Sequence, residues 1–100
     1  MKNPYESLDK VLEHRMRLQL MGILAANDSY DFNALKELLE TTDGNLATHI
    51  KHLEREKYIN IHKSFVDRKP NTRYKISDRG RTAFKKHIEA MEEIIRSQRK

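Results

Sequence analysis

The chain has 100 residues, no cysteine and a formal net charge of +5 at pH 7. A chain of this length is expected to form a single domain with a modest hydrophobic core. The absence of cysteine excludes disulfides, thiolate metal sites and cysteine redox sensing. The longest mostly apolar run, residues 18–26, is too short to cross a bilayer, so we expect a cytoplasmic protein that does not bind a membrane.

The charge is distributed unevenly along the chain. Residues 1–50 hold five Lys/Arg against eight Asp/Glu, whereas residues 51–100 hold fifteen against seven. The densest stretch, residues 62–86, contains nine basic and two acidic residues. A cluster of this kind favours an anionic partner, most commonly nucleic acid, over the alternative of a basic surface that is merely well solvated.

The first expected helix lies near the N-terminus. Residues 1–6 are expected to be loose, and Ser7 is a candidate N-cap. One face of the helix collects Leu8, Val11 and Leu12, and the apolar pattern continues to residue 24. The spacing leaves open whether this is one helix or two with a break near His14. The turn formers of "ANDSYD", residues 26–31, then end it.

A very short extended piece at residues 30–32 and a second helix are expected next. Asn33 is a candidate cap for this helix, in which Leu35, Leu38 and Leu39 would face inward. The two threonines at positions 41 and 42 then end the helix and open the following one.

The third expected helix spans residues 42–56, within "TTDGNLATHIKHLERE". Thr42 is a good N-cap, and Asp43 would stabilise the positive first turn. The spacing i, i+4, i+7 of its aliphatics predicts one buried face, made by Leu46, Ile50 and Leu53. The opposite face is polar and basic, with one residue at its flank, His49; its members are Gly44, Asn45, Thr48, Lys51, His52 and Arg55.

That outward face has the chemistry needed to read base edges. Asn makes paired hydrogen bonds to adenine, Thr contacts thymine methyls or phosphates, and Arg and Lys suit guanine or phosphate. Gly44 costs about 1 kcal/mol of helix propensity relative to Ala and leaves room for a sugar-phosphate wall. An ordinary amphipathic helix is the alternative. Asp43 would repel phosphate, so we expect it to face away from DNA or to pair with a basic residue of the following hairpin.

A β-hairpin is expected over residues 59–76. "YINIHKSFV" and "TRYKI" alternate apolar and polar residues, and "DRKPN" between them reads as a turn in which Pro70 presets the backbone. The turn and return strand carry one acid, Asp67, and four cations: Arg68, Lys69, Arg73 and Lys75. We interpret these cations as contacts to phosphates or a minor groove, rather than as a charged edge that prevents strand aggregation.

The last expected helix spans residues 78–97 and begins after the candidate cap Ser77. Its apolar stripe is long for a domain of this size. Exposed apolar stripes indicate a partner, so we expect a homodimer, with a self-contained monomer core as the alternative. The expected dimer interface combines the first and last helices: Leu8, Val11, Leu12, Ile88, Met91, Ile94 and Ile95.

Catalytic and metal sites are not indicated by the sequence. There is no glycine-rich phosphate loop, no His-Glu-x-x-His run and no nucleophile elbow. His49 and His52 are spaced so that one helix could present both to a metal, but no cysteine or well-placed carboxylate completes the set. We expect neither an enzyme nor a metal or cofactor.

Three segments together resemble the small MarR-type winged-helix transcription regulators, which are close to the ArsR type: "LEHRMRLQLMGIL", "DFNALKELLETTDGNLATHIKHLEREKYI" and "RKPNTRYKISDRGRTAF". The resemblance covers roughly residues 8–90. It implies a dimer formed by terminal helices, with recognition helices in successive major grooves. It places Thr42, Asn45, Thr48, His49 and His52 on or near the reading face and Arg68, Lys69 and Arg73 on the wing. Longer members add helices that shape a ligand pocket, and this chain shows no evident effector site.

The sequence thus predicts one mainly α-helical domain with a small β-hairpin, a winged helix-turn-helix with a long C-terminal helix. The predicted function is homodimeric, sequence-specific binding of double-stranded DNA in transcription regulation. Two alternatives stay open: a winged helix that docks an acidic protein, and an architectural protein that binds DNA without sequence preference. The operator, the regulated genes, the direction of regulation and any effector are not predicted.

Overall fold

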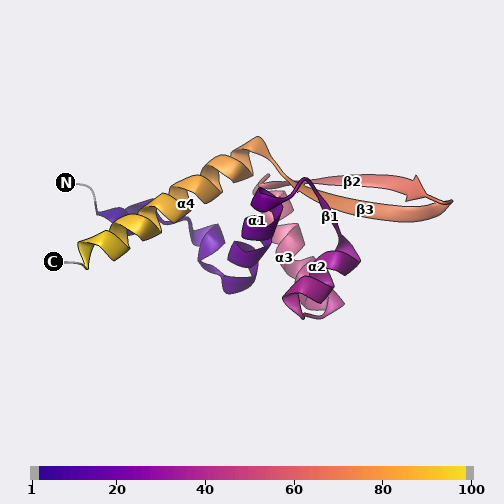
Figure 1. Ribbon diagram of the computed structural model, residues 1–100, viewed down its shortest axis with the longest axis horizontal. Coiled ribbons are helices and arrows are strands. Elements are labelled where there is room, and N and C mark those ends of the chain that lie inside the picture. Colours follow the sequence, from indigo (N-terminus) through magenta and orange to yellow (C-terminus); the bar gives the residue numbers. More distant parts are fainter. Residues whose placement is uncertain (1–2, 99–100) are drawn as a thin grey trace.

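The computed structural model describes residues 3–98, and its elements follow the expected order (Figure 1). Two short 3-10 turns, η1 (Pro4–Ser7) and η2 (Lys10–Glu13), precede the helices. The body comprises α1 (Arg15–Ala26), β1 (Tyr30–Asp31), α2 (Phe32–Leu39), α3 (Asp43–Arg55), β2 (Ile59–Val66), β3 (Lys69–Ile76) and α4 (Asp78–Ser97). The molecule is elongated, 58 × 26 × 21 Å, because α4 and the β2–β3 hairpin extend to opposite sides of the helical body.

The N-terminal segment is divided at His14. Asp9 caps η2 by accepting a hydrogen bond from the Val11 N–H (2.9 Å), and His14 caps α1 by accepting from the Met16 N–H (3.1 Å). The sequence-based choice between one helix and two is therefore resolved in favour of a break. Pro4–Ser7 packs along α4, so the expectation that residues 1–6 are loose is wrong for this turn. The expected cap at Ser7 is also wrong, because Asn3 caps η1 and Asp9 caps η2. Residues 1 and 2 lie outside the described part of the chain.

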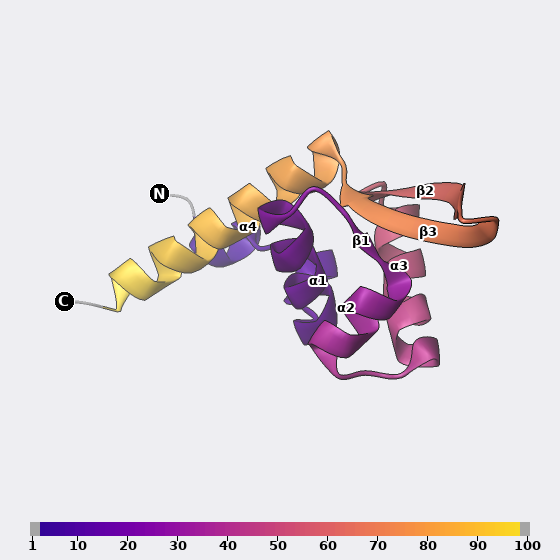
Figure 2. The same ribbon diagram turned by 45° about the vertical axis from the view of Figure 1, so that its right-hand side comes forward.

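Helices α2 and α3 are joined by a short turn, as Figure 2 shows from a second side. Asp31, rather than Asn33, caps α2, and its carboxylate accepts from the Ala34 N–H at 2.8 Å. Glu40 ends the helix in the left-handed conformation (φ 48°). Thr42 caps α3 by accepting from the Asn45 N–H (3.2 Å), as the sequence predicts.

The sheet has the order β1-β3-β2, and both pairings are antiparallel. The hairpin turn consists of Asp67 and Arg68 (φ 51° and 66°), the positive φ pair of a two-residue turn that matches the strand twist. Pro70 lies within β3, opposite Phe65 in β2. The expected turn over residues 67–71 is thus wrong in its extent. We call the hairpin formed by β2 and β3, residues 59–76, the wing.

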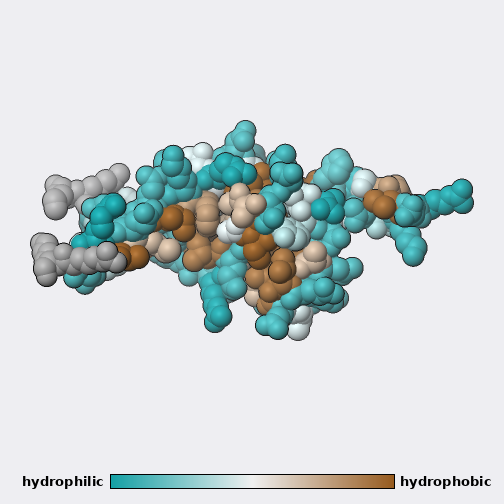
Figure 3. Space-filling model, in the orientation of Figure 1, coloured by the Kyte–Doolittle hydropathy of each residue, from teal (hydrophilic) through white to brown (hydrophobic). Residues whose placement is uncertain are grey.

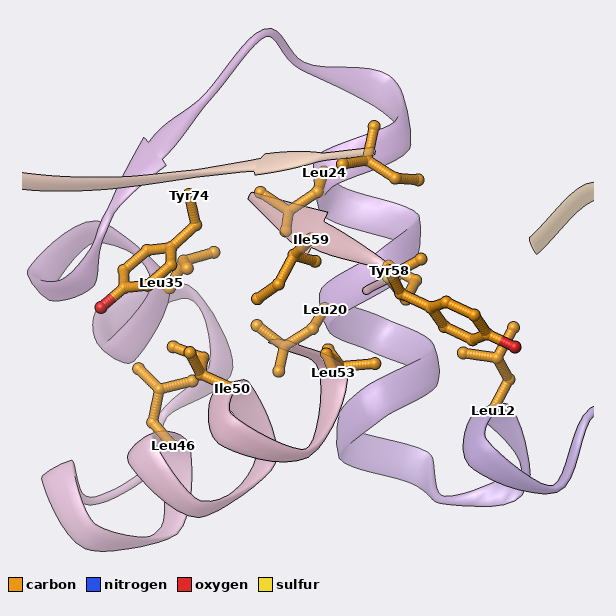
Figure 4. Packing of buried hydrophobic residues seen from close by; sticks show 12 residues of the cluster. Leu12, Leu20, Leu24, Leu35, Leu46, Ile50, Leu53, Tyr58, Ile59 and Tyr74 are labelled. Carbon is orange, nitrogen blue, oxygen red and sulfur yellow. The ribbon is translucent and has the colours of Figure 1, made fainter. Parts of the chain in front are cut away.

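The core lies where the three helices meet the base of the wing (Figure 4). The predicted inner face of α3 is confirmed: Leu46, Ile50 and Leu53 are buried against residues from α1, α2 and the sheet. Leu12 is completely buried in the same cluster and cannot also lie in a dimer interface, which corrects that prediction. Leu38, expected to face inward, is 55% exposed.

The start of α4 is locked to the base of the wing. Ser77 accepts from the Gly80 N–H (2.9 Å) and donates its own N–H to the Tyr58 carbonyl oxygen (3.0 Å). The Tyr58 hydroxyl donates to the Asp9 carboxylate, and the Asp9 N–H donates to Nδ1 of buried His87 (2.9 Å). We call these five residues the junction. It fixes the direction in which the wing leaves the body relative to α4.

Candidate nucleic-acid interface

The outward face of α3 is exposed and polar at the residues that the sequence indicates. Its exposed members are Thr42, Asp43, Gly44, Asn45, Thr48, Lys51, Glu54 and Arg55, and His52 is half-buried beside them. Asn45 donates one amide hydrogen to Oγ1 of Thr41 (2.8 Å), and Thr48 donates its hydroxyl to the Gly44 carbonyl (2.8 Å). These local bonds leave the Asn45 side-chain oxygen and the Thr48 lone pairs as acceptors for an approaching base edge.

Gly44 has no packing reason to lack a side chain. A Cβ built on it would meet nothing within 4 Å among the residues that the structure describes. Its backbone φ is not positive, so conformation does not require glycine either. The space it leaves open is on the outside of the first turn of α3.

Asp43 pairs with Lys36 of α2 at 2.8 Å. The carboxylate therefore turns toward the preceding helix, and its partner is not a cation of the wing. Of the two expectations for Asp43, pairing with a basic residue of the wing is therefore wrong, and facing away from DNA stays a prediction. The pairing with Lys36 also explains an acid in this position, because the pair neutralises the charge within the helix-turn-helix while Asp43 occupies the positive first turn of α3.

His49 does not belong to the exposed face. The residue is only 8% exposed, and its ring packs against that of His14 at a tilt of 40°, with 4.2 Å between the ring centroids. Nη1 of Arg17 donates to its Nδ1 (3.2 Å). Burial first, and then the neighbouring positive charges, lower the pKa of His49 below 6.5. The neutral ring is thus an acceptor for Arg17, and the predicted place of His49 at a reading face is wrong.

The wing carries exposed cations at its tip and along both strands. Lys63, Arg68, Lys69 and Lys75 are exposed, and within residues 3–98 none of them forms a salt bridge. Arg73 differs: it donates from Nε to Oγ of Ser29 (2.8 Å) and from Nη2 to the Ser29 carbonyl (3.0 Å). Its guanidinium ties the turn before β1 to the wing. It is half-buried, and its predicted contact with DNA stays a prediction.

A cleft of about 630 Å³ separates α3 from the wing. The side chains of Lys51, Lys63 and Thr72 line it, together with the acid Glu54. Lys63 was missed by sequence reasoning. The strand register could have found it, because Lys63 lies opposite Thr72 on the face of β2 that also carries Ile61. The cleft joins the two basic elements into one surface.

Neither a metal cluster nor a membrane-spanning helix is found in the described residues. Between residues 3 and 98, the structure brings together no group of three or more His, Asp or Glu side chains suited to a metal ion. In the same part of the chain, none of the helices combines the length and apolarity needed to cross a membrane.

Comparison with known proteins decides the family. The winged helix DNA-binding domain family matches residues 16–95. The chain belongs to this family. An uncharacterized protein of Methanocaldococcus jannaschii is 37% identical over 79 residues, which cover 79% of this chain and 86% of the relative. The family assignment makes DNA binding, rather than catalysis, the role to which the fold points.

Solved structures of winged-helix proteins share the fold. A transcriptional regulator homologue from Pyrococcus horikoshii superposes with a TM-score of 0.88 at 28% identity, covering 98% of each chain. YusO from Bacillus subtilis (TM-score 0.77, 15% identity) covers 96% of this winged-helix chain and 67% of its own. MepR from S. aureus (0.68, 22%) covers 90% and 70%. These likenesses confirm the resemblance to winged-helix transcription regulators drawn from the sequence.

Proposed function

We propose that this winged-helix protein is a sequence-specific regulator of transcription that binds double-stranded DNA as a homodimer. In the proposal, α3 enters the major groove, and the wing contacts the backbone or the neighbouring minor groove. We also propose, in keeping with a role on DNA, that the protein acts in the cytoplasm. The observation that carries the proposal is the shared cleft, which Lys51 of α3 and Lys63 of the wing border together, with Glu54 as the one acid in its lining.

The two elements divide the work of recognition between them. The wing cations neutralise phosphates and supply affinity that depends on salt but not on sequence. Asn45, Thr48 and Arg55 are exposed on α3, where they supply base contacts. In the cleft, Lys51, Lys63 and Thr72 hold the strand of phosphates that separates the two grooves.

The homodimer is proposed from the arm formed by α4 and η1. Ile95 and Tyr5 are exposed hydrophobic residues on this arm (53% and 58%). Among the residues predicted to form the interface, Leu8, Val11, Ile88, Met91 and Ile94 are half-buried, so each retains surface that a partner could cover. Pairing of two arms would place two copies of α3 at a fixed separation, about 34 Å for half-sites one helical turn apart.

The test is a selection of bound sites from random duplexes, followed by affinity measurements over a range of salt concentrations. We expect a palindromic site. We expect Arg68→Ala and Lys69→Ala to weaken binding to all duplexes alike and each to reduce the salt slope by about one. Asn45→Ala should change the preferred bases and leave the salt slope nearly unchanged. Lys10→Ala, which removes an exposed cation of η2, is the matched control for overall charge.

Three results would contradict the proposal in different ways. Salt-dependent binding without any enriched site would favour an architectural DNA-binding protein. Absence of duplex binding would favour a winged helix that docks an acidic protein through the same cations. An asymmetric site bound by a monomer would retain the DNA-binding proposal but contradict the homodimer.

A further inference from the structure

The tip of the wing carries exposed apolar side chains. Phe65 is 75% exposed and Val66 is 53% exposed. The space-filling view shows hydrophobic atoms near the far end of the hairpin, bordered by hydrophilic residues (Figure 3). A large ring exposed to this extent adds little to the stability of the fold, and it offers apolar area to a partner.

The strand register places the two apolar side chains on opposite faces of the wing. Directly paired residues of antiparallel strands project to the same face, and successive residues alternate. Phe65 pairs with Pro70, and this face continues through the pair Lys63 and Thr72 to Ile61. Val66 pairs with Lys69 on the other face.

The face that carries Phe65 and Pro70 is the one turned toward α3. Ile61, Lys63 and Thr72 belong to this face, and all three line the cleft between α3 and the wing. Phe65 and Pro70 therefore extend the α3 side of the wing beyond the cleft. If α3 lies in a major groove, this side meets the neighbouring minor groove.

The surrounding charge identifies the partner. Lys63, Arg68 and Lys69 are exposed around the tip, against the single acid Asp67, and none of the three cations forms a salt bridge within residues 3–98. An apolar ring within a cluster of unpaired cations matches a surface on which phosphates flank apolar base faces. The minor groove of DNA offers this arrangement, because phosphates border it and the proteins that bind it insert Phe and Pro between the stacked bases of one step.

We propose that Phe65, supported by Pro70, is a wedge that enters the minor groove beside the half-site and partly unstacks one base step. This inference rests on the proposed DNA-binding function and assigns to it a site that contacts bases outside the major groove. Flexible pyrimidine–purine steps are easily unstacked, so the wedge selects TA or CA/TG steps at a fixed distance from the sequence read by α3.

The experiment uses the full chain and its selected duplex, with 2-aminopurine placed in turn at each position of the flanking minor groove. The wild-type protein should raise 2-aminopurine fluorescence at one step and bend the duplex, as measured by energy transfer between its ends. Phe65→Ala should lose both signals and bind about tenfold more weakly, because stacking on an aromatic ring is lost. Phe65→Leu keeps an apolar wedge and should retain the bend.

Val66→Ala is the matched control, because it removes apolar surface from the same tip on the opposite face. It should bind and bend DNA as the wild-type protein does. The wedge is overturned if Phe65→Ala unstacks and bends DNA like the wild type, or if Val66→Ala is equally impaired. In both cases the wild-type protein still prefers one site, so the proposed function stands. If the wild-type protein selects no site at all, the proposed function fails first.

Discussion

The junction and the first turn of α3 each contain a glycine, and the surroundings of the two glycines differ. At Gly80 of the junction, a Cβ would lie 2.8 Å from the carbonyl carbon of Tyr58 and closer still to its oxygen. At Gly44, a Cβ would meet nothing within 4 Å in the described residues. Internal contacts therefore explain Gly80, whereas no contact within the described residues explains Gly44. The comparison separates a glycine that the fold requires from one that the fold leaves free.

The largest expected effect comes from adding a side-chain atom to the junction, where none can be accommodated. Gly80→Ala forces the added methyl group into the Tyr58 backbone, which also accepts the Ser77 N–H. We expect a loss of about 3 kcal/mol in the free energy of unfolding, at the upper end for overpacking. Urea unfolding followed by circular dichroism measures it. A variant as stable as the wild type would show that the start of α4 moves away from the wing without cost.

The second effect concerns the hydroxyl at the centre of the junction. Burial, followed by the hydrogen bond and charge of Asp9, raises the pKa of Tyr58 from 10.0 to about 12. The folded protein therefore holds this proton more tightly than the unfolded chain. The resulting stability is present below pH 10 and is lost as the pH rises through 12.

We expect Tyr58→Phe to lower the free energy of unfolding by about 2 kcal/mol near neutral pH, because a hydrogen bond to a charged group is removed. The difference from the wild type should shrink as the pH rises from 10 to 12. Unfolding titrations of both proteins over this range measure it. A difference independent of pH would contradict the role of the hydroxyl proton.

The third effect is a loss of stability in acid. Burial holds the pKa of His87 below 6.5, against the opposing charges of Asp9 and Glu13. The unfolded chain therefore binds more protons than the folded protein below this pH, and stability falls as the pH drops through 6.5. His87→Gln keeps an acceptor for the Asp9 N–H and should flatten this decline. Urea unfolding between about pH 7 and about pH 5 measures the difference.

The pKa of His49 is lowered first by burial as well, so part of the acid decline should remain in the His87→Gln variant. If the variant loses stability in acid as steeply as the wild type, a lowered pKa of His87 in the folded protein is not the cause of the acid decline.

The smallest expected effect on stability comes from Gly44→Ala. This variant is also the most direct test of the difference between Gly44 and Gly80. The new methyl group enters open space and improves helix propensity, so we expect stability to rise by up to about 1 kcal/mol. Binding to the selected duplex should weaken at the same time, because the methyl group occupies the approach of a sugar-phosphate wall. Thermal unfolding and duplex titration of the same sample measure both quantities. Unchanged binding would remove the proposed reason for this glycine.

Local patterns predicted much of this fold. The spacing of Leu46, Ile50 and Leu53 predicts the buried face of α3, and the capping chemistry of Thr42 and Ser77 predicts where α3 and α4 begin. Both depend on interactions within a few residues, which a sequence displays directly. The same spacing also gives the outward face of α3.

Three of the differences have a common physical cause, because they depend on side-chain partners in other elements of the fold. His49 is held away from the outward face of α3 beside Arg17, and the guanidinium of Arg73 is bound by Ser29. Asp43 finds its cation on the preceding helix rather than on the wing. The spacing of apolar residues and the positions of caps and turn residues carry no information about such partners.

The hairpin turn was misplaced for a different reason. Pro70 is a strong turn signal, yet it lies in β3, the central strand. Strand β1 pairs with β3 only at Arg73 and Tyr74, so no third strand needs the N–H that Pro70 lacks. Asp67 and Arg68 form the turn although neither is glycine, and a non-glycine residue at positive φ is uncommon. A prediction that relies on proline as the turn signal, rather than on Asp67 and Arg68, extends the turn too far along the chain.

The two-residue turn at Asp67 and Arg68 has a consequence for how such a protein can change over generations. Its length sets which residues of β2 and β3 stand opposite each other, and side chains alternate with a period of two. Insertion or deletion of one residue there would invert the sidedness of the outer part of one strand without altering any amino acid in it. The ring of Phe65 or its partner Pro70 would then point away from α3. A single codon at this turn could thus change which side chains the wing presents beside α3, while α3 itself stays as it is.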